Sequence, residues 1–104
     1  MTDTLNKEFE DAFIGLSKQI IKETSYRPTI LIQMINDRGS VATAKTLINS
    51  NKPSEGYTKL WELGALNLTV EAFVLENPKW HQLFTEVDLN KAKQRLLAFK
   101  YEIK

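Results

Sequence analysis

The sequence predicts an all-α protein: a single compact domain of six or seven helices, with long helices at both ends and short ones between. Apolar residues recur at steps of three and four along most of the chain. Ser, Thr, Gly and Pro stand where those patterns begin or end. No stretch of useful length alternates apolar and polar residues as a strand would. The chain has 104 residues, which is the length of one domain. We divide it into an N-terminal helix at 1–25 and a helical module at 26–104.

The first helix is expected from Thr4 to about Thr24, because its apolar residues form one stripe. It ends near Pro28, since the residue before a proline avoids helical geometry. Pro28 also suits the first turn of a second helix, which runs to Arg38 and is apolar nearly all round. That second helix is therefore predicted to be central and buried. The stripe of the first helix comprises Leu5, Phe9, Ala12, Phe13, Leu16 and Ile20.

Glycines and hydroxyl residues punctuate the middle of the chain. Gly39 ends the second helix, and Ser40 is expected to cap a third, which has its inner face at Val41, Ala44, Leu47 and Ile48. A loop at 49–53 follows. Ser54 then caps a short helix that Gly64 terminates.

The last third contains two helix starts of the same design, at Thr69 and Thr85. Each Thr can accept a hydrogen bond from the first turn, each follows an apolar residue, and each precedes acidic residues that the helix dipole favours. The helix after Thr69 is short, one or two further turns lead to Phe84, and the last helix runs to about Glu102. The predicted core comprises Phe9, Phe13, Leu31, Met34, Ile35, Leu47, Leu60, Trp61, Phe73, Leu83, Leu96 and Phe99.

Composition and motif spacing argue against catalysis. The chain has no Cys, which excludes disulfides and thiolate metal sites. His81 is the only imidazole and has no carboxylate at a motif spacing, while no glycine pair forms a phosphate loop. We therefore expect no enzyme, no catalytic residue, no metal and no cofactor. The start lacks the features of a signal peptide and no apolar run could span a bilayer, so a cytoplasmic protein is expected, without membrane contact.

Two kinds of macromolecular partner remain open. A protein partner would use the aromatic residues Tyr57, Trp61 and Trp80; most should be core, with one of the two tryptophans half-exposed as an anchor. The alternative is DNA, although a net charge of +1 argues against a non-specific binder. The DNA hypothesis takes the helix after Gly39 as the helix that reads the bases, and adds a basic strip on the last helix. The other interpretation of that strip, together with Lys91 and Arg95, is an ordinary solvent-exposed face. The residues of the DNA hypothesis are Thr43, Lys45, Asn49, Lys93, Lys100 and Lys104.

Several segments of the chain resemble a small uncharacterised bacterial helical module, over roughly residues 26–102. They are Met34-Ile35, 39–48, 54–61, 64–71, 83–85 and 92–96. The module occurs alone or attached to other bacterial proteins, some of which resemble restriction or nuclease proteins. The resemblance implies a bacterial setting and a DNA-defence context, and it implies no catalytic residues.

Together these observations predict a non-enzymatic accessory or adaptor domain that binds a macromolecule, with a protein as the first choice and DNA as the alternative. The first helix lies outside the region of resemblance. If the chain does not cover its apolar stripe, a homodimer through this helix is expected; if the stripe packs inside its own chain, a monomer is expected.

Overall fold

The computed structural model describes residues 2–103, and these form an all-helical globule of 37 × 26 × 24 Å without a strand. The predicted fold class is therefore confirmed. Six α-helices and two 3₁₀ helices (η) follow one another along the described chain. They are α1 (Thr2–Thr24), α2 (Thr29–Arg38), α3 (Ser40–Asn49), α4 (Glu55–Glu62), η1 (Leu66–Leu68), α5 (Val70–Leu75), η2 (Pro78–Leu83) and α6 (Glu86–Ala98).

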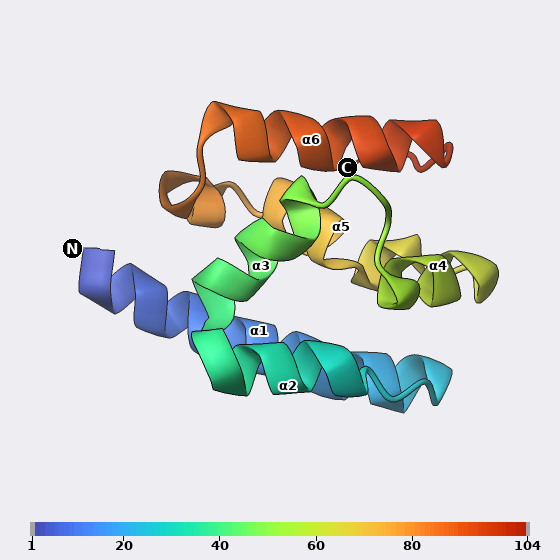
Figure 1. The fold of residues 1–104 in the computed structure, drawn as a ribbon, viewed down its shortest axis with the longest axis horizontal. Coiled ribbons are helices and arrows are strands. Elements are labelled where there is room, and N and C mark those ends of the chain that lie inside the picture. The colour runs from blue at the N-terminus through green and yellow to red at the C-terminus, as the bar shows by residue number, and fades with distance from the viewer. Residues whose placement is uncertain (1, 104) are drawn as a thin grey trace.

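The helices are arranged in three tiers (Figure 1). Helices α1 and α2 lie side by side along one side of the molecule, and α6 lies along the opposite side. Between them, α3 crosses from α2 to α6 and contacts α1, α2, α5 and α6. Helix α4 stands at one end of the middle tier. The central helices of the molecule are thus α3 and α5, and not α2.

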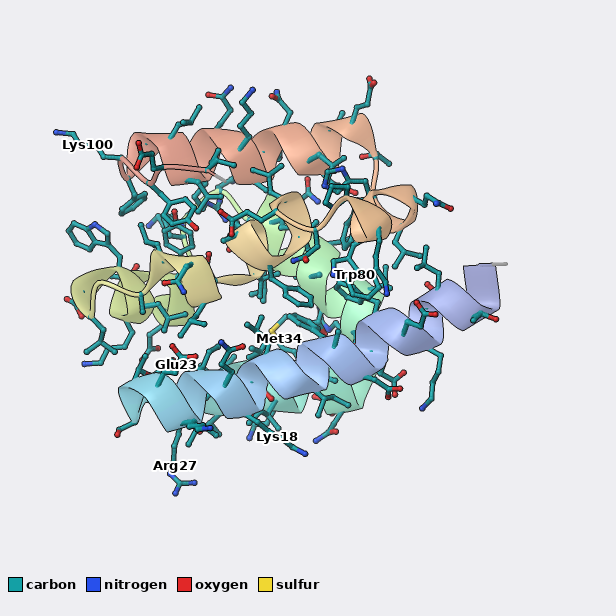
Figure 2. The ribbon with its side chains drawn as sticks, turned by 180° about the vertical axis from the view of Figure 1, so that it is seen from behind. Lys18, Glu23, Arg27, Met34, Trp80 and Lys100 are labelled. Atoms are coloured by element: carbon teal, nitrogen blue, oxygen red, sulfur yellow. The ribbon has the colours of Figure 1, made fainter. Side chains whose placement is uncertain are left out.

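An aromatic cluster joins α1 to the middle tier. The ring of Phe9 lies 5.2 Å from that of Phe13, 5.3 Å from that of Trp80 and 5.7 Å from those of Phe73 and Phe84. Each such pair adds about 0.5–1.5 kcal/mol beyond the area it buries. Figure 2 shows Trp80 on the inner side of α1, while Lys18 points away from the body.

The apolar stripe of α1 is internal. Phe9, Phe13, Leu16 and Ile20 are all buried by the chain's own helices. Of the two alternatives for this stripe, the structure shows the one in which it packs inside its own chain, because α2, α3 and η2 together cover it. The apolar surface on which a homodimer through the N-terminal helix was predicted is therefore already covered by the same chain.

The predicted caps at Ser54, Thr69 and Thr85 are confirmed. Their hydroxyl oxygens accept hydrogen bonds from the backbone N–H groups of Tyr57, Ala72 and Asp88, at 3.0, 3.2 and 3.1 Å. At α6 the bond is reciprocal, since the backbone N–H of Thr85 donates to Asp88 Oδ2 at 2.9 Å. This capping box is a stronger start signal for α6 than the acidic first turn predicted from sequence.

Ser40 does not cap α3. It is the first helical residue and is buried, and its hydroxyl has no hydrogen-bond partner among the described residues. Gly39, at φ +86°, takes the capping position, because α3 begins immediately after α2 and a residue there needs the left-handed region.

Helix α2 has no buried residue, which contradicts its predicted central position. It packs on α1 and α3 from one side only, so its apolar residues extend to the surface. Ile30 is 58% exposed and Ile32 is 36% exposed, while Leu31, Met34 and Ile35 are half-buried. The exposed side of α2 is therefore mixed, with Ile30 and Ile32 uncovered beside polar residues such as Gln33 and Asn36.

The other members of the predicted core divide by depth. Five are buried: Phe9, Phe13, Leu60, Leu83 and Leu96. Three more are half-buried: Leu47, Phe73 and Phe99. The prediction that Trp61 belongs to the core is wrong, because this side chain is 48% exposed.

Helix α6 ends at Ala98, four residues before the predicted Glu102. Lys100 has φ +61°, and the N–H groups of Lys100 and Tyr101 donate to the carbonyls of Leu97 and Leu96, both at 2.9 Å. This is a Schellman motif, which normally has glycine at the left-handed position. Helix α4 ends in the same way with Gly64, at φ +70°.

Replacing Thr85 with Ala should lower the free energy of unfolding by about 1 kcal/mol through loss of the cap. Urea denaturation measures the change. Thr58→Ala is the control, because Thr58 is exposed within α4 and Ala favours a helix there. Equal stability of Thr85→Ala and Thr58→Ala would contradict the role of the capping box.

Replacing Lys100 with Gly should raise the free energy of unfolding by about 0.5–1 kcal/mol, because a side chain in the left-handed region costs about 1–2 kcal/mol and the gain is partly offset by a more flexible unfolded chain. The opposite change at the equivalent position of α4, Gly64→Ala, should lower it by about 1 kcal/mol. Thermal unfolding of both variants tests the assignment, and a stabilised Gly64→Ala would refute it.

Candidate functional site

The residues predicted to read DNA do not form one surface. Thr43 is fully buried, so its expected outward position is wrong. The side-chain amide of Asn49 donates to the Lys45 carbonyl and to Asp88 Oδ1, both at 2.8 Å. Helix α3 packs against α1, α2, α5 and α6; Lys45 on it is half-buried, and its exposed residues are Ala42 and Thr46. Lys93 and Lys100 are exposed on and after α6, and Lys104 lies outside the described residues.

Asp88 receives enough hydrogen bonds to stay charged. Burial would raise its pKa, but the bonds from Asn49 and Thr85 outweigh that effect and hold the pKa of Asp88 below its ordinary value. Asn49 therefore joins the end of α3 to the start of α6, which is a structural role.

The three aromatic residues predicted to bind a partner differ in how far they are exposed. Tyr57 and Trp80 are buried, whereas Trp61 is half-exposed, which confirms that one of the two tryptophans reaches the surface. The rings of Tyr57 and Trp61 lie 5.1 and 5.4 Å from that of Phe99. The Tyr57 hydroxyl donates to the Arg95 carbonyl at 3.2 Å. Only Trp61 of the three can touch a partner directly.

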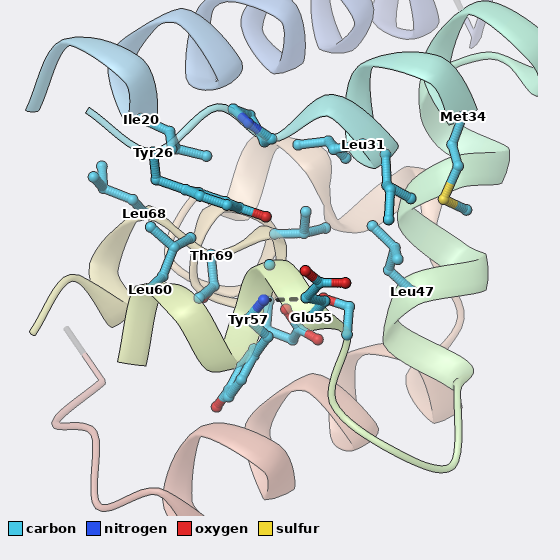
Figure 3. A pocket seen from close by; sticks show the side chains of 16 residues that line it. Ile20, Tyr26, Leu31, Met34, Leu47, Glu55, Tyr57, Leu60, Leu68 and Thr69 are labelled. Carbon is cyan, nitrogen blue, oxygen red and sulfur yellow. Dashed lines mark hydrogen bonds between the residues drawn. The ribbon is translucent and has the colours of Figure 1, made fainter. Parts of the chain in front are cut away.

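A pocket lies where the end of α1, α2, α4 and α5 meet (Figure 3). Its volume is about 70 Å³. Its apolar wall includes Ile20, Leu31, Leu47, Leu60, Leu68 and Val70. The exposed Ile30 also lines it, so the pocket is continuous with the uncovered face of α2.

Tyr26 and Glu55 supply polar groups to this pocket. Figure 3 shows the Tyr26 ring lying across it with the hydroxyl directed inward. That oxygen is 3.5 Å from the position that a Cβ on Gly56 would take, so the phenol lies against the first turn of α4. Burial, and secondly the charge of Glu55, raise the pKa of Tyr26, since both disfavour the phenolate.

Glu71 and Arg95 form a buried ion pair beside the pocket. Arg95 Nη1 lies 2.9 Å from Glu71 Oε2, and the two side chains are 11% and 4% exposed. The guanidinium also donates to the Leu47 carbonyl at 3.0 Å and to the Ser50 carbonyl. Burial raises the pKa of Glu71, and the bond and charge of Arg95 oppose that effect without reversing it.

Sequence reasoning missed this pair. The sequence placed Arg95 on a solvated face and Glu71 among the first-turn acids that the helix dipole favours, yet the two side chains are only 11% and 4% exposed. The partners are 24 residues apart and belong to different helices, so no local spacing could relate them.

The remaining candidate groups have plain structural surroundings. His81 Nε2 lies 3.1 Å from the Leu75 carbonyl. Within the described part of the chain, no group of three or more His, Asp or Glu side chains could hold a metal ion. No helix in residues 2–103 has the length and apolar content to cross a membrane.

Comparison with protein families, curated proteins and solved structures finds no match to this chain. The site must therefore be interpreted from its own chemistry.

Replacing Arg95 with Met should lower the free energy of unfolding by about 3–5 kcal/mol, because Glu71 would keep its burial and lose its counter-charge. The pKa of Glu71, already above 4.5, should rise further. The folded state then holds a proton that the unfolded state releases, so stability should fall as pH rises above 4.5.

Urea titrations at about pH 5 and about pH 7.5 measure this slope. Adding Glu71→Gln to Arg95→Met should restore part of the stability and remove the added pH dependence. A pH slope that persists in the double variant would show that another group causes it.

Proposed function

We propose that this chain is a non-enzymatic adaptor that binds a partner protein over α2 and the adjoining pocket. The observation that supports it is the exposure of α2, which contains Ile30, Leu31, Ile32, Met34 and Ile35 and buries none of them fully. A surface helix normally presents polar residues to the solvent, because exposed apolar side chains are unfavourable in water. Contiguous apolar surface beside a concavity is typical of a protein-binding site.

The energetic gain from covering this face is substantial. Fully burying an exposed Ile side chain stabilises a complex by about 1.5–3 kcal/mol. Ile30 is 58% exposed in the free chain, so a partner that covers it would gain a large part of that free energy. Leu31 and Met34 stand half-buried next to it and line the same pocket. A partner that covers these three side chains would gain most at the centre of the contact, where binding energy concentrates.

The alternative, DNA binding, has weaker support. Thr43 is buried and Asn49 is held by Asp88, so the reading helix lacks two of its three residues. The exposed Lys93 and Lys100 could still meet phosphates. Binding that weakens steeply with salt would distinguish this alternative from an apolar contact.

The resemblance to a bacterial helical module implies a DNA-defence setting, and an adaptor that binds another protein fits that setting.

The adaptor is tested by placing a photo-crosslinking residue at Ile30 in the full chain within its native cells. The matched control site is Val87, a 63% exposed apolar residue on α6, the helix that lies on the opposite side of the molecule from α2. We expect a discrete protein adduct from Ile30 only, which is then identified and purified.

The purified partner should bind the unmodified chain, and Ile30→Asp should weaken binding at least about tenfold, since about 1.4 kcal/mol corresponds to that factor. Val87→Asp should leave the dissociation constant unchanged. An adduct with nucleic acid, or an equal loss in both variants with the fold intact, would contradict the proposal.

A further inference from the structure

The pocket beside α2 has a chemical preference that follows from its lining. It contains two carboxylates, Glu55 and Glu71, and no basic side chain. Arg95 already neutralises Glu71. Glu55 has no cationic side chain within 4.0 Å among the described residues, so its charge is available to an incoming group.

The size of the pocket limits what can enter. Pockets for cofactors and substrates typically measure about 300–1,000 Å³, whereas this one measures about 70 Å³. A space of this size holds a few waters or one side chain. It opens next to the exposed Ile30, where a partner protein would lie.

We propose that the pocket receives one basic side chain, Lys or Arg, from the partner protein. The aliphatic stem packs on Leu31 and Leu60, and the charged head lies beside Glu55 and the Tyr26 hydroxyl. This inference rests on the proposed function and names the chemistry that the partner must supply.

The competing occupants fit less well. A purely apolar side chain would remove water from Glu55 and Tyr26 and leave both without a partner, which is costly. An acidic side chain would be repelled by the negative charge of Glu55, which is exposed at the mouth of the pocket. A basic side chain matches both halves of the pocket, because its stem is apolar and its head is a donor and a cation. For Arg, the Tyr26 ring offers a further cation–π contact.

Three four-carbon probes separate these possibilities: butylammonium, butanol and butyrate. Each is titrated into the full ¹⁵N-labelled chain while the backbone amides are followed by NMR. We expect butylammonium to shift the amides of Glu55 and Gly56 and to bind about fivefold more tightly than butanol, as one partly exposed ion pair allows. Butyrate should bind most weakly.

Glu55→Gln should bring butylammonium to the level of butanol. Glu62→Gln is the matched control, since Glu62 is exposed at the other end of α4. Equal affinity for butanol and butylammonium, or an unchanged affinity in Glu55→Gln, would overturn this inference.

The two proposals fail separately. If the pocket shows no preference for the cation but Ile30→Asp still releases the partner, the adaptor stands and the basic side chain is wrong. If butylammonium binds as expected but Ile30→Asp leaves the partner bound, the cation site is supported and the adaptor surface is wrong.

Discussion

The ion pair between Glu71 and Arg95 is the constraint on which the rest of the structure depends. A single guanidinium from α6 holds the carboxylate of α5, the Leu47 carbonyl near the end of α3 and the Ser50 carbonyl of the following loop. Those acceptors would otherwise be poorly satisfied at a helix end. The same contacts set the path of the loop that leads into α4, and α4 forms one wall of the pocket. Fold and candidate site thus share one buried cation.

This arrangement leaves the molecule with two unlike sides. Around Phe9 the rings of α1, α5 and η2 pack closely, and α6 lies over the middle tier. Helix α2, in contrast, rests on α1 and α3 by one face and exposes Ile30. A chain of this size has only a modest core, and α2 lies at its edge, so Ile30 and Ile32 are left uncovered. The uncovered face and the pocket beside it are where the chain can gain most by binding.

The sequence by itself determined the helices and their limits. Helix ends can be predicted locally, because caps and left-handed glycines act through hydrogen bonds within four or five residues, as at Ser54, Gly64 and Thr85. The apolar stripe of α1 could also be predicted, because its period follows from helix geometry. The absence of Cys excluded thiolate chemistry in the same direct way. Two local signals failed: Lys100 rather than a glycine takes the left-handed region at the end of α6, and Gly39 rather than Ser40 takes the capping position of α3.

Tertiary structure alone decided which side of each helix is covered. Nothing in the composition of α2 distinguishes a buried helix from an uncovered docking face, since both are apolar all round. Thr43 is buried and Trp61 is half-exposed because of the helices that lie beside them, 20 or more residues away in some cases. The pocket needs Tyr26, Glu55 and Glu71 from three segments, and the ion pair needs α5 and α6 to meet. Such contacts arise from packing, in which many weak interactions are summed over the whole chain, so no pattern of spacing can record them.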